Sequence, residues 1–242
     1  MNDFSGTILE RYGIINEVIR KAAEKSGRAP EAIKLLAVTK GHPLPILQSA
    51  YSIGLRDFGE NYVEEAIDKI EFFKQNGKVN WHMIGHLQSR KTRQICEYFS
   101  WFQALDRMKI ADRLSTYCQE IKRELPVLIE CNVSGEASKF GWPAWDETKW
   151  DHLACEFSRL THLPGIQVKG LMTMAPFFDD PELTRPFFSR LRKLRDYLSL
   201  NVPTVAWIEL SMGMSIDYQI AIEEGATIIR IGTALLGDGL KT

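Results

Sequence analysis

The sequence has no excess charge of either sign and no long apolar run. Thirty basic residues stand against thirty-one acidic ones, so the chain lacks the basic surface that is typical of nucleic-acid binders. No stretch reaches the roughly 18 apolar residues of a membrane-spanning helix, and the first ten residues have no apolar signal core. These absences argue against nucleic-acid binding and membrane insertion, and they predict a cytoplasmic protein.

Cysteine is scarce as well. The four cysteines are scattered and form no Cys-x-x-Cys pair, and they are Cys96, Cys118, Cys131 and Cys155. Neither a zinc site nor a disulfide framework is indicated by this spacing. We therefore predict no metal site and expect all four to be reduced thiols in the core.

No linker, low-complexity tract or repeat divides the chain, so residues 1–242 are expected to form one domain, close to the roughly 250 residues of a single α/β barrel. Short β-rich runs alternate with stretches of helical period. Eight such runs lie near 35–39, 55–58, 80–84, 100–104, 126–132, 166–172, 205–210 and 227–231. Parallel pairing of these runs predicts an α/β fold, a (β/α)8 TIM barrel, with an open doubly wound sheet as the alternative.

An extra helix is expected before the first run. Ile8, Tyr12, Ile15 and Ile19 follow one another at spacings of three and four, which places them on one helical face.

Lys40 ends the first predicted strand, directly after Leu35–Thr39 and before Gly41-His42-Pro43. Barrels carry their catalytic groups at the carboxyl ends of strands. A lysine that is desolvated there can lose its proton and attack a carbonyl to form a Schiff base. The alternative is an ordinary solvated lysine beside a turn.

Two loops rich in small residues follow the last two runs. Residues 211–215 (Ser-Met-Gly-Met-Ser) lead into a predicted helix at 216–224, and residues 231–234 (Ile-Gly-Thr-Ala) lead into another. Backbone N–H groups and helix N-termini in these positions favour a phosphate. The alternative is turn and capping chemistry, with Ser215 as an N-cap.

Arg230 lies inside the eighth run, where a buried cation needs a partner. It either pairs with Glu209 or Asp57, or donates to a bound ring or anion.

Other polar residues are expected at the same end of the barrel. Asn61 either binds a ligand or caps a helix. His82 and His86 have no nearby cysteine and no serine spaced for a triad, so structural roles are favoured for both. Lys139 follows the fifth run and is expected in a solvated loop.

Seven segments in order resemble the pyridoxal phosphate homeostasis protein family. They are LLAVTK at Lys40, FGENYVEE at Asn61, WHMIGHLQ at His82, NVSGEASKFG at Lys139, GLMTMAP at Gly170, LSMGMSIDY at Ser211 and RIGTALLG at Arg230. The likeness runs from about residue 35 to 237, with departures at Gly41-His42 and at Arg90.

The resemblance implies a single barrel like the N-terminal domain of alanine racemase, called fold type III, that binds pyridoxal 5'-phosphate. Lys40 would hold the cofactor as an internal aldimine, Asn61 would line the ring pocket and Arg230 would face the pyridine nitrogen. The phosphate would be bound by Ser211, Met212, Gly213, Gly232 and Thr233.

We expect a cofactor carrier without catalytic residues rather than an enzyme. Arginine can only donate a hydrogen bond, so the pyridine nitrogen that it faces stays unprotonated and the ring is a weak electron sink. No acid or base opposite Lys40 is identifiable in the sequence. The carrier would serve vitamin B6 homeostasis as a monomer, with apo-enzymes that use the cofactor as acceptors. The alternatives are an amino-acid racemase, aldolase or decarboxylase, and a regulatory protein that the cofactor only stabilises.

Overall fold

The computed structural model describes residues 4–239, and within them eight parallel strands close into a barrel. The strands pair in the order β1, β2, β3, β4, β5, β7, β8, β9, and β9 returns to β1. Their bounds are β1 Lys34–Val38, β2 Asp57–Glu60, β3 Asn80–Met83, β4 Trp101–Leu105, β5 Leu125–Asn132, β7 Ile166–Met172, β8 Glu209–Ser211 and β9 Ile228–Ile231. The TIM-barrel prediction is confirmed, and the open-sheet alternative is wrong because β4 pairs with β5.

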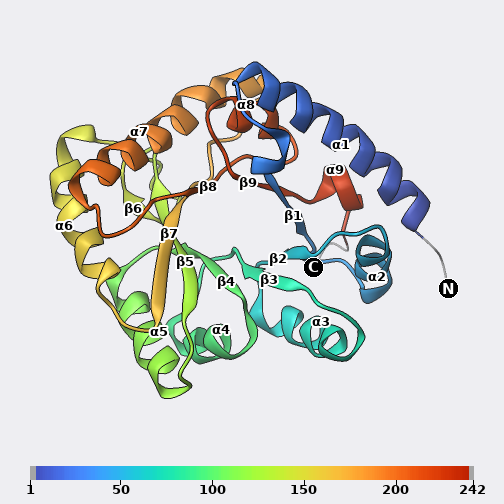
Figure 1. Ribbon diagram of the computed structural model, residues 1–242, viewed down its shortest axis with the longest axis horizontal. Coiled ribbons are helices and arrows are strands. Elements are labelled where there is room, and N and C mark those ends of the chain that lie inside the picture. Colours follow the sequence, from blue (N-terminus) through green and yellow to red (C-terminus); the bar gives the residue numbers. More distant parts are fainter. Residues whose placement is uncertain (1–3, 240–242) are drawn as a thin grey trace.

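Helices surround the barrel, as Figure 1 shows. They are α1 Ser5–Lys25, α2 Leu44–Ser52, α3 Val63–Asn76, α4 Thr92–Tyr98, α5 Met108–Glu120, α6 Trp150–Thr161, α7 Arg185–Asn201, α8 Tyr218–Glu223 and α9 Thr233–Leu236. Short 3-10 turns occur at Pro30–Ala32, Ser89–Lys91, Glu147–Lys149 and Pro181–Thr184. No helix within residues 4–239 is both long and apolar enough to cross a membrane.

The extra N-terminal helix is present as α1. It buries Ile8, Ile15 and Ile19, and Tyr12 packs against the core, as its spacing predicted. α1 contacts α2, α8 and α9, so it covers the part of the helical ring where the first and last strands meet (Figure 1).

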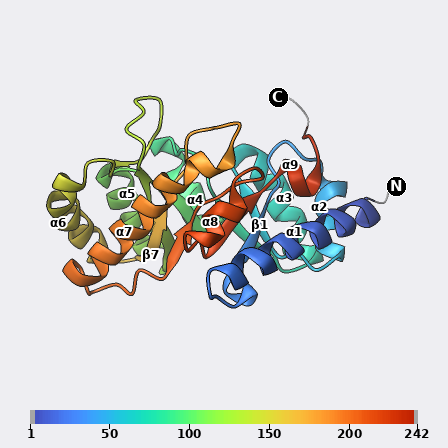
Figure 2. The ribbon, with the colours of Figure 1, turned by 90° about the horizontal axis from the view of Figure 1, so that it is seen from above.

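Three local expectations are wrong. The seventh strand covers Glu209–Ser211 rather than 205–210, and Trp207 before it has a positive φ of 49°. α8 begins at Tyr218 rather than at residue 216. A two-residue strand β6, Trp142–Pro143, pairs with the end of β5 and was not predicted. The loop between β5 and β6, drawn in yellow-green, projects upward from the barrel in the view of Figure 2.

The core fills the barrel and the space between barrel and helices. Cys96, Cys118 and Cys131 are free and buried there, as expected, but Cys155 is exposed on α6 and the prediction of a core thiol is wrong for it.

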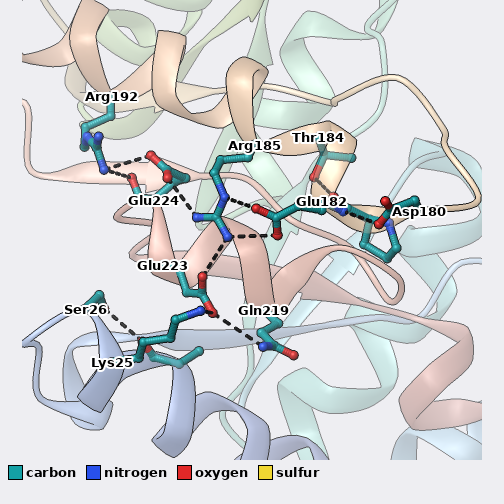
Figure 3. Close-up of polar contacts among 12 residues, drawn as sticks. Lys25, Ser26, Asp180, Glu182, Thr184, Arg185, Arg192, Gln219, Glu223 and Glu224 are labelled. Carbon is teal, nitrogen blue, oxygen red and sulfur yellow. Dashed lines mark hydrogen bonds and ion pairs between the residues drawn. The ribbon is translucent and has the colours of Figure 1, made fainter.

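A group of ion pairs ties α1, α7 and α8 together on the outside of the barrel (Figure 3). Arg185 contacts Glu223 and Glu224 at 2.8 and 2.9 Å, and Lys25 contacts Glu223 at 2.9 Å. The two glutamates lie at the C-terminal end of α8, where the helix dipole disfavours negative charge. The arginine and the lysine offset that repulsion.

Candidate functional site

A cavity of about 580 Å³ opens at the carboxyl ends of the strands. This volume suits a small organic ligand or cofactor. Five predicted site residues line it, namely Lys40, Asn61, Arg230, Gly232 and Thr233. Ser211, Met212 and Gly213 are buried and are not among its lining residues.

Lys40 is exposed at this cavity, and its amine makes no ion pair with the part of the chain that the structure describes. Of the two alternatives, the solvated lysine describes its environment at this cavity better than the desolvated one. Its amine is available to a ligand, since no carboxylate within residues 4–239 pairs with it.

The backbone on both sides of Lys40 is held by a buried group that we call the Lys69 cluster, formed by Thr39, Glu60, Glu65 and Lys69. The Lys69 ammonium donates to the Thr39 carbonyl at 2.8 Å and to Glu60 Oε1 at 2.8 Å and Glu65 Oε1 at 2.6 Å. Glu65 Oε1 also accepts from the Gly41 amide at 2.6 Å. The cluster thus fixes the residues before and after Lys40.

Sequence reasoning missed this role, although Glu60 and Glu65 lie in a segment that it singled out. Glu65 and Lys69 are four residues apart on α3, a spacing at which an acid and a base interact. That spacing was the available signal.

Arg230 is 4% exposed and points into the cavity wall. Its guanidinium donates to Ser211 Oγ and to the Thr173 carbonyl, both at 2.8 Å. The suggested pairing with Glu209 or Asp57 is wrong, because neither carboxylate is within hydrogen-bond or ion-pair distance of it. Burial lowers the pKa of Arg230 to about 10, while Asp217 and Glu130 act in the opposite direction, so the group stays charged at neutral pH.

The two small-residue loops meet at the cavity. Ser215 Oγ accepts from the Ala234 amide at 3.3 Å, which joins the loop after β8 to the start of α9. The N–H groups of Ser215, Ile216 and Thr233 make no hydrogen bond within residues 4–239, and all three residues line the cavity. Unpaired N–H groups of residues that line one cavity are suited to an anion.

The capping interpretation of Ser215 is wrong. Asp217 is the N-cap residue of α8, and its side chain accepts from the Met214 amide at 2.6 Å rather than from a helical N–H. α8 and α9 have six and four residues, so the helix-dipole contribution is smaller than expected and the loop amides matter more.

Gly213 has a structural reason to be glycine. Its φ is +91°, and a Cβ there would lie 2.5 Å from the Ala221 Cβ. A larger residue would push this loop away from α8.

Asn61 lines the cavity and does not cap α3, since Tyr62 occupies the N-cap position. The backbone of Asn61 packs on Gly85, where a Cβ would lie 2.4 Å from the Asn61 carbonyl oxygen. Gly85 therefore sets the position of Asn61.

Glu130 and His86 also line the cavity, and sequence reasoning gave neither a ligand-facing role. Glu130 on β5 is 3% exposed, and its Oε2 has no hydrogen-bond partner within the described residues. Burial, with a smaller contribution from Asp106, raises the pKa of Glu130 to about 7. His86 contacts Asp106 at 2.9 Å and stacks on Phe140 with ring centroids 3.7 Å apart.

β5 stands opposite β1 in the strand order, so Glu130 and Lys40 come from opposite sides of the barrel. The cavity thus contains a titratable acid on the side of the barrel opposite Lys40, where we identified none in the sequence. The sequence does not show which face of its strand Glu130 occupies, so it gave no signal for this position.

The side chains of His82 and Lys139 both make hydrogen bonds or ion pairs with other groups of the protein. His82 is fully buried and has a partner at each ring nitrogen, which confirms the structural interpretation. Lys139 contacts the Met174 carbonyl and Glu136, both at 2.9 Å, and is paired rather than freely solvated.

Related sequences match nearly the whole chain. The family model of the alanine racemase N-terminal domain matches residues 15–239. A pyridoxal phosphate homeostasis protein of Pseudomonas aeruginosa is 42% identical over 231 residues, covering 96% of this chain and 95% of that protein. The Aquifex aeolicus protein of the same name is 40% identical, covering 95% of this chain and 97% of that protein.

Solved structures agree with these sequences. PipY of Synechococcus elongatus is 34% identical, covers 91% of this chain and 100% of its own, and superposes with a TM-score of 0.80. The structure of PipY with PLP bound gives a TM-score of 0.79. An alanine racemase of Clostridium difficile, at 13% identity and a TM-score of 0.64 over 55% of its chain, shares the fold.

Proposed function

The chain belongs to the family of pyridoxal phosphate homeostasis proteins, whose barrel is the alanine racemase N-terminal domain, and from this we propose that it binds pyridoxal 5'-phosphate (PLP) and serves intracellular PLP homeostasis. The whole chain acts as one PLP-binding domain. One observation carries the proposal: an unpaired lysine amine and a set of unpaired backbone N–H groups open onto the same cavity.

The residues of the cavity fit each part of the cofactor. PLP supplies an aldehyde that condenses with a primary amine and a pyridine ring that withdraws electrons. Lys40 would hold the cofactor through its amine, and Asn61 would line the pocket of the ring. The amides of Ser215, Ile216 and Thr233, with Gly232 beside them, would bind the phosphate.

Ser211, Met212 and Gly213 were expected to bind the phosphate as well, but they are buried and do not line the cavity, so we assign them to holding the loop after β8 in place. Arg230 would face the ring nitrogen as a donor, which would leave that nitrogen unprotonated and the ring a weak electron sink. This favours storage and delivery over turnover.

PLP on the protein passes to apo-enzymes that require it, and the carrier acts as a monomer in the cytoplasm. The three buried thiols and the exposed Cys155, all unpaired, suit a reducing compartment. Transfer is tested by incubating the loaded protein with an apo-enzyme and an excess of a trap for free PLP. Activation that survives the trap supports direct delivery, and activation that the trap abolishes contradicts it.

Borohydride reduction followed by peptide mapping tests the attachment. We expect the label on Lys40 and its loss in Lys40→Ala. Lys139→Ala is the matched control, because Lys139 is a second lysine on a loop at the same end of the barrel, and it should keep the label on Lys40. Label found chiefly on another lysine, with Lys40 unmodified, would contradict the proposal.

A second function, PLP-dependent racemisation, elimination or decarboxylation of amino acids, is favoured by Glu130, which provides an acid opposite Lys40. Loaded protein is assayed against a panel of L- and D-amino acids, with Glu130→Gln as the control. Turnover within the usual range of about 1 to 1000 per second that Glu130→Gln abolishes would establish an enzyme, whereas slow exchange alone supports the carrier.

A further inference from the structure

A line of five polar side chains crosses the inside of the barrel from the cavity to its opposite end. Arg230 donates to Ser211 Oγ at 2.8 Å, and Ser211 Oγ donates to Gln103 Oε1 at 2.7 Å. Gln103 Nε2 lies 2.9 Å from His82 Nδ1, and His82 Nε2 lies 3.1 Å from Asp57 Oδ1. We call this line the Arg230–Asp57 chain.

The Arg230–Asp57 chain runs between the two ends of the barrel, as the positions of its residues on their strands show. Ser211 is the last residue of β8, on the cavity side, and Asp57 is the first residue of β2, at the opposite end. Ser211, Gln103 and His82 are fully buried. Gln103 and His82 do not line the cavity.

The donors of the chain all point in one direction. An arginine can only donate, so Ser211 accepts from it and passes its own hydrogen to the amide oxygen of Gln103. The amide nitrogen of Gln103 then donates to His82 Nδ1. His82 must therefore carry its hydrogen on Nε2, where it is donated to Asp57.

This order connects a buried cation with a distant carboxylate. Arg230 has no carboxylate within ion-pair distance among residues 4–239, and an isolated buried charge is costly. Hydrogen bonds that share one direction polarise one another. The negative end of the line is Asp57, whose side chain is 19% exposed.

The protonation states of His82 and Asp57 agree with the direction of the hydrogen bonds in the Arg230–Asp57 chain. Burial lowers the pKa of His82, against the influence of Asp57, so its imidazole is neutral at physiological pH. Lys34 and Glu209 also act on His82, in opposite directions, and Trp101 stacks on its ring with centroids 5.6 Å apart. For Asp57, burial favours the neutral form, but the hydrogen bond from His82, together with Lys34 and Asn80, outweighs it and the pKa of Asp57 is lowered.

We propose that Gln103 and His82 are positioning residues that orient the Arg230 guanidinium toward the ring of the ligand, with Asp57 fixing the direction of the chain. The inference rests on the proposed PLP site. It assigns an effect on the cofactor to residues that touch neither the cofactor nor the cavity.

Three variants cut the Arg230–Asp57 chain at different points. Gln103→Leu removes both of its central hydrogen bonds. Gln103→Glu keeps an acceptor for Ser211 but has no N–H group for His82 Nδ1, so it separates the Arg230 side of the chain from the Asp57 side. Asp57→Asn removes the charge at the far end, on a half-buried residue whose replacement disturbs the core least.

PLP affinity and the absorbance spectrum of the bound cofactor are measured for each. We expect about tenfold weaker binding and a shifted spectrum for Gln103→Leu. Smaller changes are expected for Gln103→Glu and Asp57→Asn, since both keep an acceptor for Ser211 at position 103. Ser115→Ala is the matched control, because it removes a buried hydrogen bond to the Pro164 carbonyl that is outside the chain, and it should leave the spectrum unchanged.

A measurement without PLP completes the test. In 15N NMR of the protein alone, His82 should show an unprotonated Nδ1 and a protonated Nε2, and Asp57→Asn should alter these resonances. An unaltered spectrum and affinity in both Gln103→Leu and Asp57→Asn, in a protein that binds PLP normally, would overturn the inference and leave the proposed function standing. Wild-type protein that fails to bind PLP would instead reject the proposed function. Should Gln103→Leu fail to fold, Asp57→Asn and the histidine resonances decide alone.

Discussion

At the scale of single residues, the site depends on buried charges that do not touch the ligand. Lys69 is 7% exposed and holds the backbone on both sides of Lys40 through Thr39 and Glu65. The side chain of Lys40 can move in solvent, but its Cα cannot move far. The backbone of Lys40 is therefore held in place while its amine is exposed, which suits an amine that has to reach the carbonyl of a ligand.

Lys69→Met should weaken both the fold and the attachment of PLP. Removing the ammonium leaves Glu60 buried without its cation, which costs about 2 to 4 kcal/mol of unfolding free energy, and it releases the strand end that carries Lys40. Urea unfolding and PLP titration measure the two effects. The control is Lys74→Met on the same helix, whose exposed pair with Glu71 contributes less than about 1 kcal/mol. Equal effects of the two substitutions would contradict the role of the Lys69 cluster in holding the backbone around Lys40.

Glu130 gives the protein a pH dependence with a definite sign. The pKa of this carboxyl rises from 4.5 to about 7 on folding, mainly through burial. Between these values the folded protein keeps a proton that the unfolded chain has lost, so stability falls as pH rises through this window. Below it the contribution is fully present, and above it the contribution is lost.

The side chain introduced by Glu130→Gln cannot ionise. The unfolding free energy of this variant, relative to that of the wild type, should therefore increase by on the order of 1 to 3 kcal/mol as pH rises from about 4.5 to 7. Denaturant unfolding without PLP at several pH values measures the gap. Glu120→Gln, at an exposed position on α5, is the control and should show no such growth. A gap independent of pH would mean that Glu130 is already charged in the folded protein.

At the scale of elements, the sequence predicted every barrel strand and the covering N-terminal helix. Parallel strands buried on both faces read as short continuous apolar runs, and the helix has its apolar residues at spacings of three and four. The prediction failed where apolar residues are buried without being in a strand. Trp207 is fully buried and its indole donates to the Val202 carbonyl at 2.9 Å, so the run before β8 looked like a strand but forms a loop. The start of α8 was misplaced because Asp217 binds the Met214 amide and delays the first turn.

The candidate site was predictable to a similar degree. Lys40, Asn61, Arg230, Gly232 and Thr233 came together because each lies near or just after the carboxyl end of a strand, and these ends meet at the barrel mouth. The partners of Arg230 could not be predicted, since Ser211 and the Thr173 carbonyl are 19 and 57 residues away in sequence. Glu130 was missed for the same reason: which face of β5 it occupies follows only from the closed barrel.

The ion pairs of Figure 3 decide how firmly α8 is held. Arg185→Met should leave Glu223 and Glu224, with side chains 6% and 10% exposed, without the cation that they share, at a helix end that disfavours negative charge. Lys25 and Arg192 would still pair with one glutamate each. We expect a loss of about 1 to 3 kcal/mol in unfolding free energy, measured by urea denaturation. Arg93→Met, which breaks only the exposed pair with Glu97, is the control. Equal losses would show that the α8 ion pairs are no more stabilising than a surface pair.

At the scale of the whole molecule, the cavity lies where the two ends of the chain meet. β1 pairs with β9 from Lys34 and Ile228 to Ala37 and Ile231, and this pairing closes the barrel. Lys40 follows the first of these strands, while Gly232 and Thr233 follow the last. A ligand attached to Lys40 and bound by the two loops would cross this closure.

PLP should therefore raise the melting temperature. A ligand that binds only the folded state at a hundredfold excess over its Kd adds about 2.7 kcal/mol, which for a chain of this size corresponds to roughly 5 to 10 °C. Loaded and unloaded proteins are melted side by side at the same protein concentration. Lys40→Ala, melted with the same amount of PLP, is the control and should shift less, because it retains the loop amides but loses the link to β1. Equal melting temperatures with and without PLP in the wild type would show that the ligand does not stabilise the closure, and an equal shift in Lys40→Ala would assign the stabilisation to the phosphate loops alone.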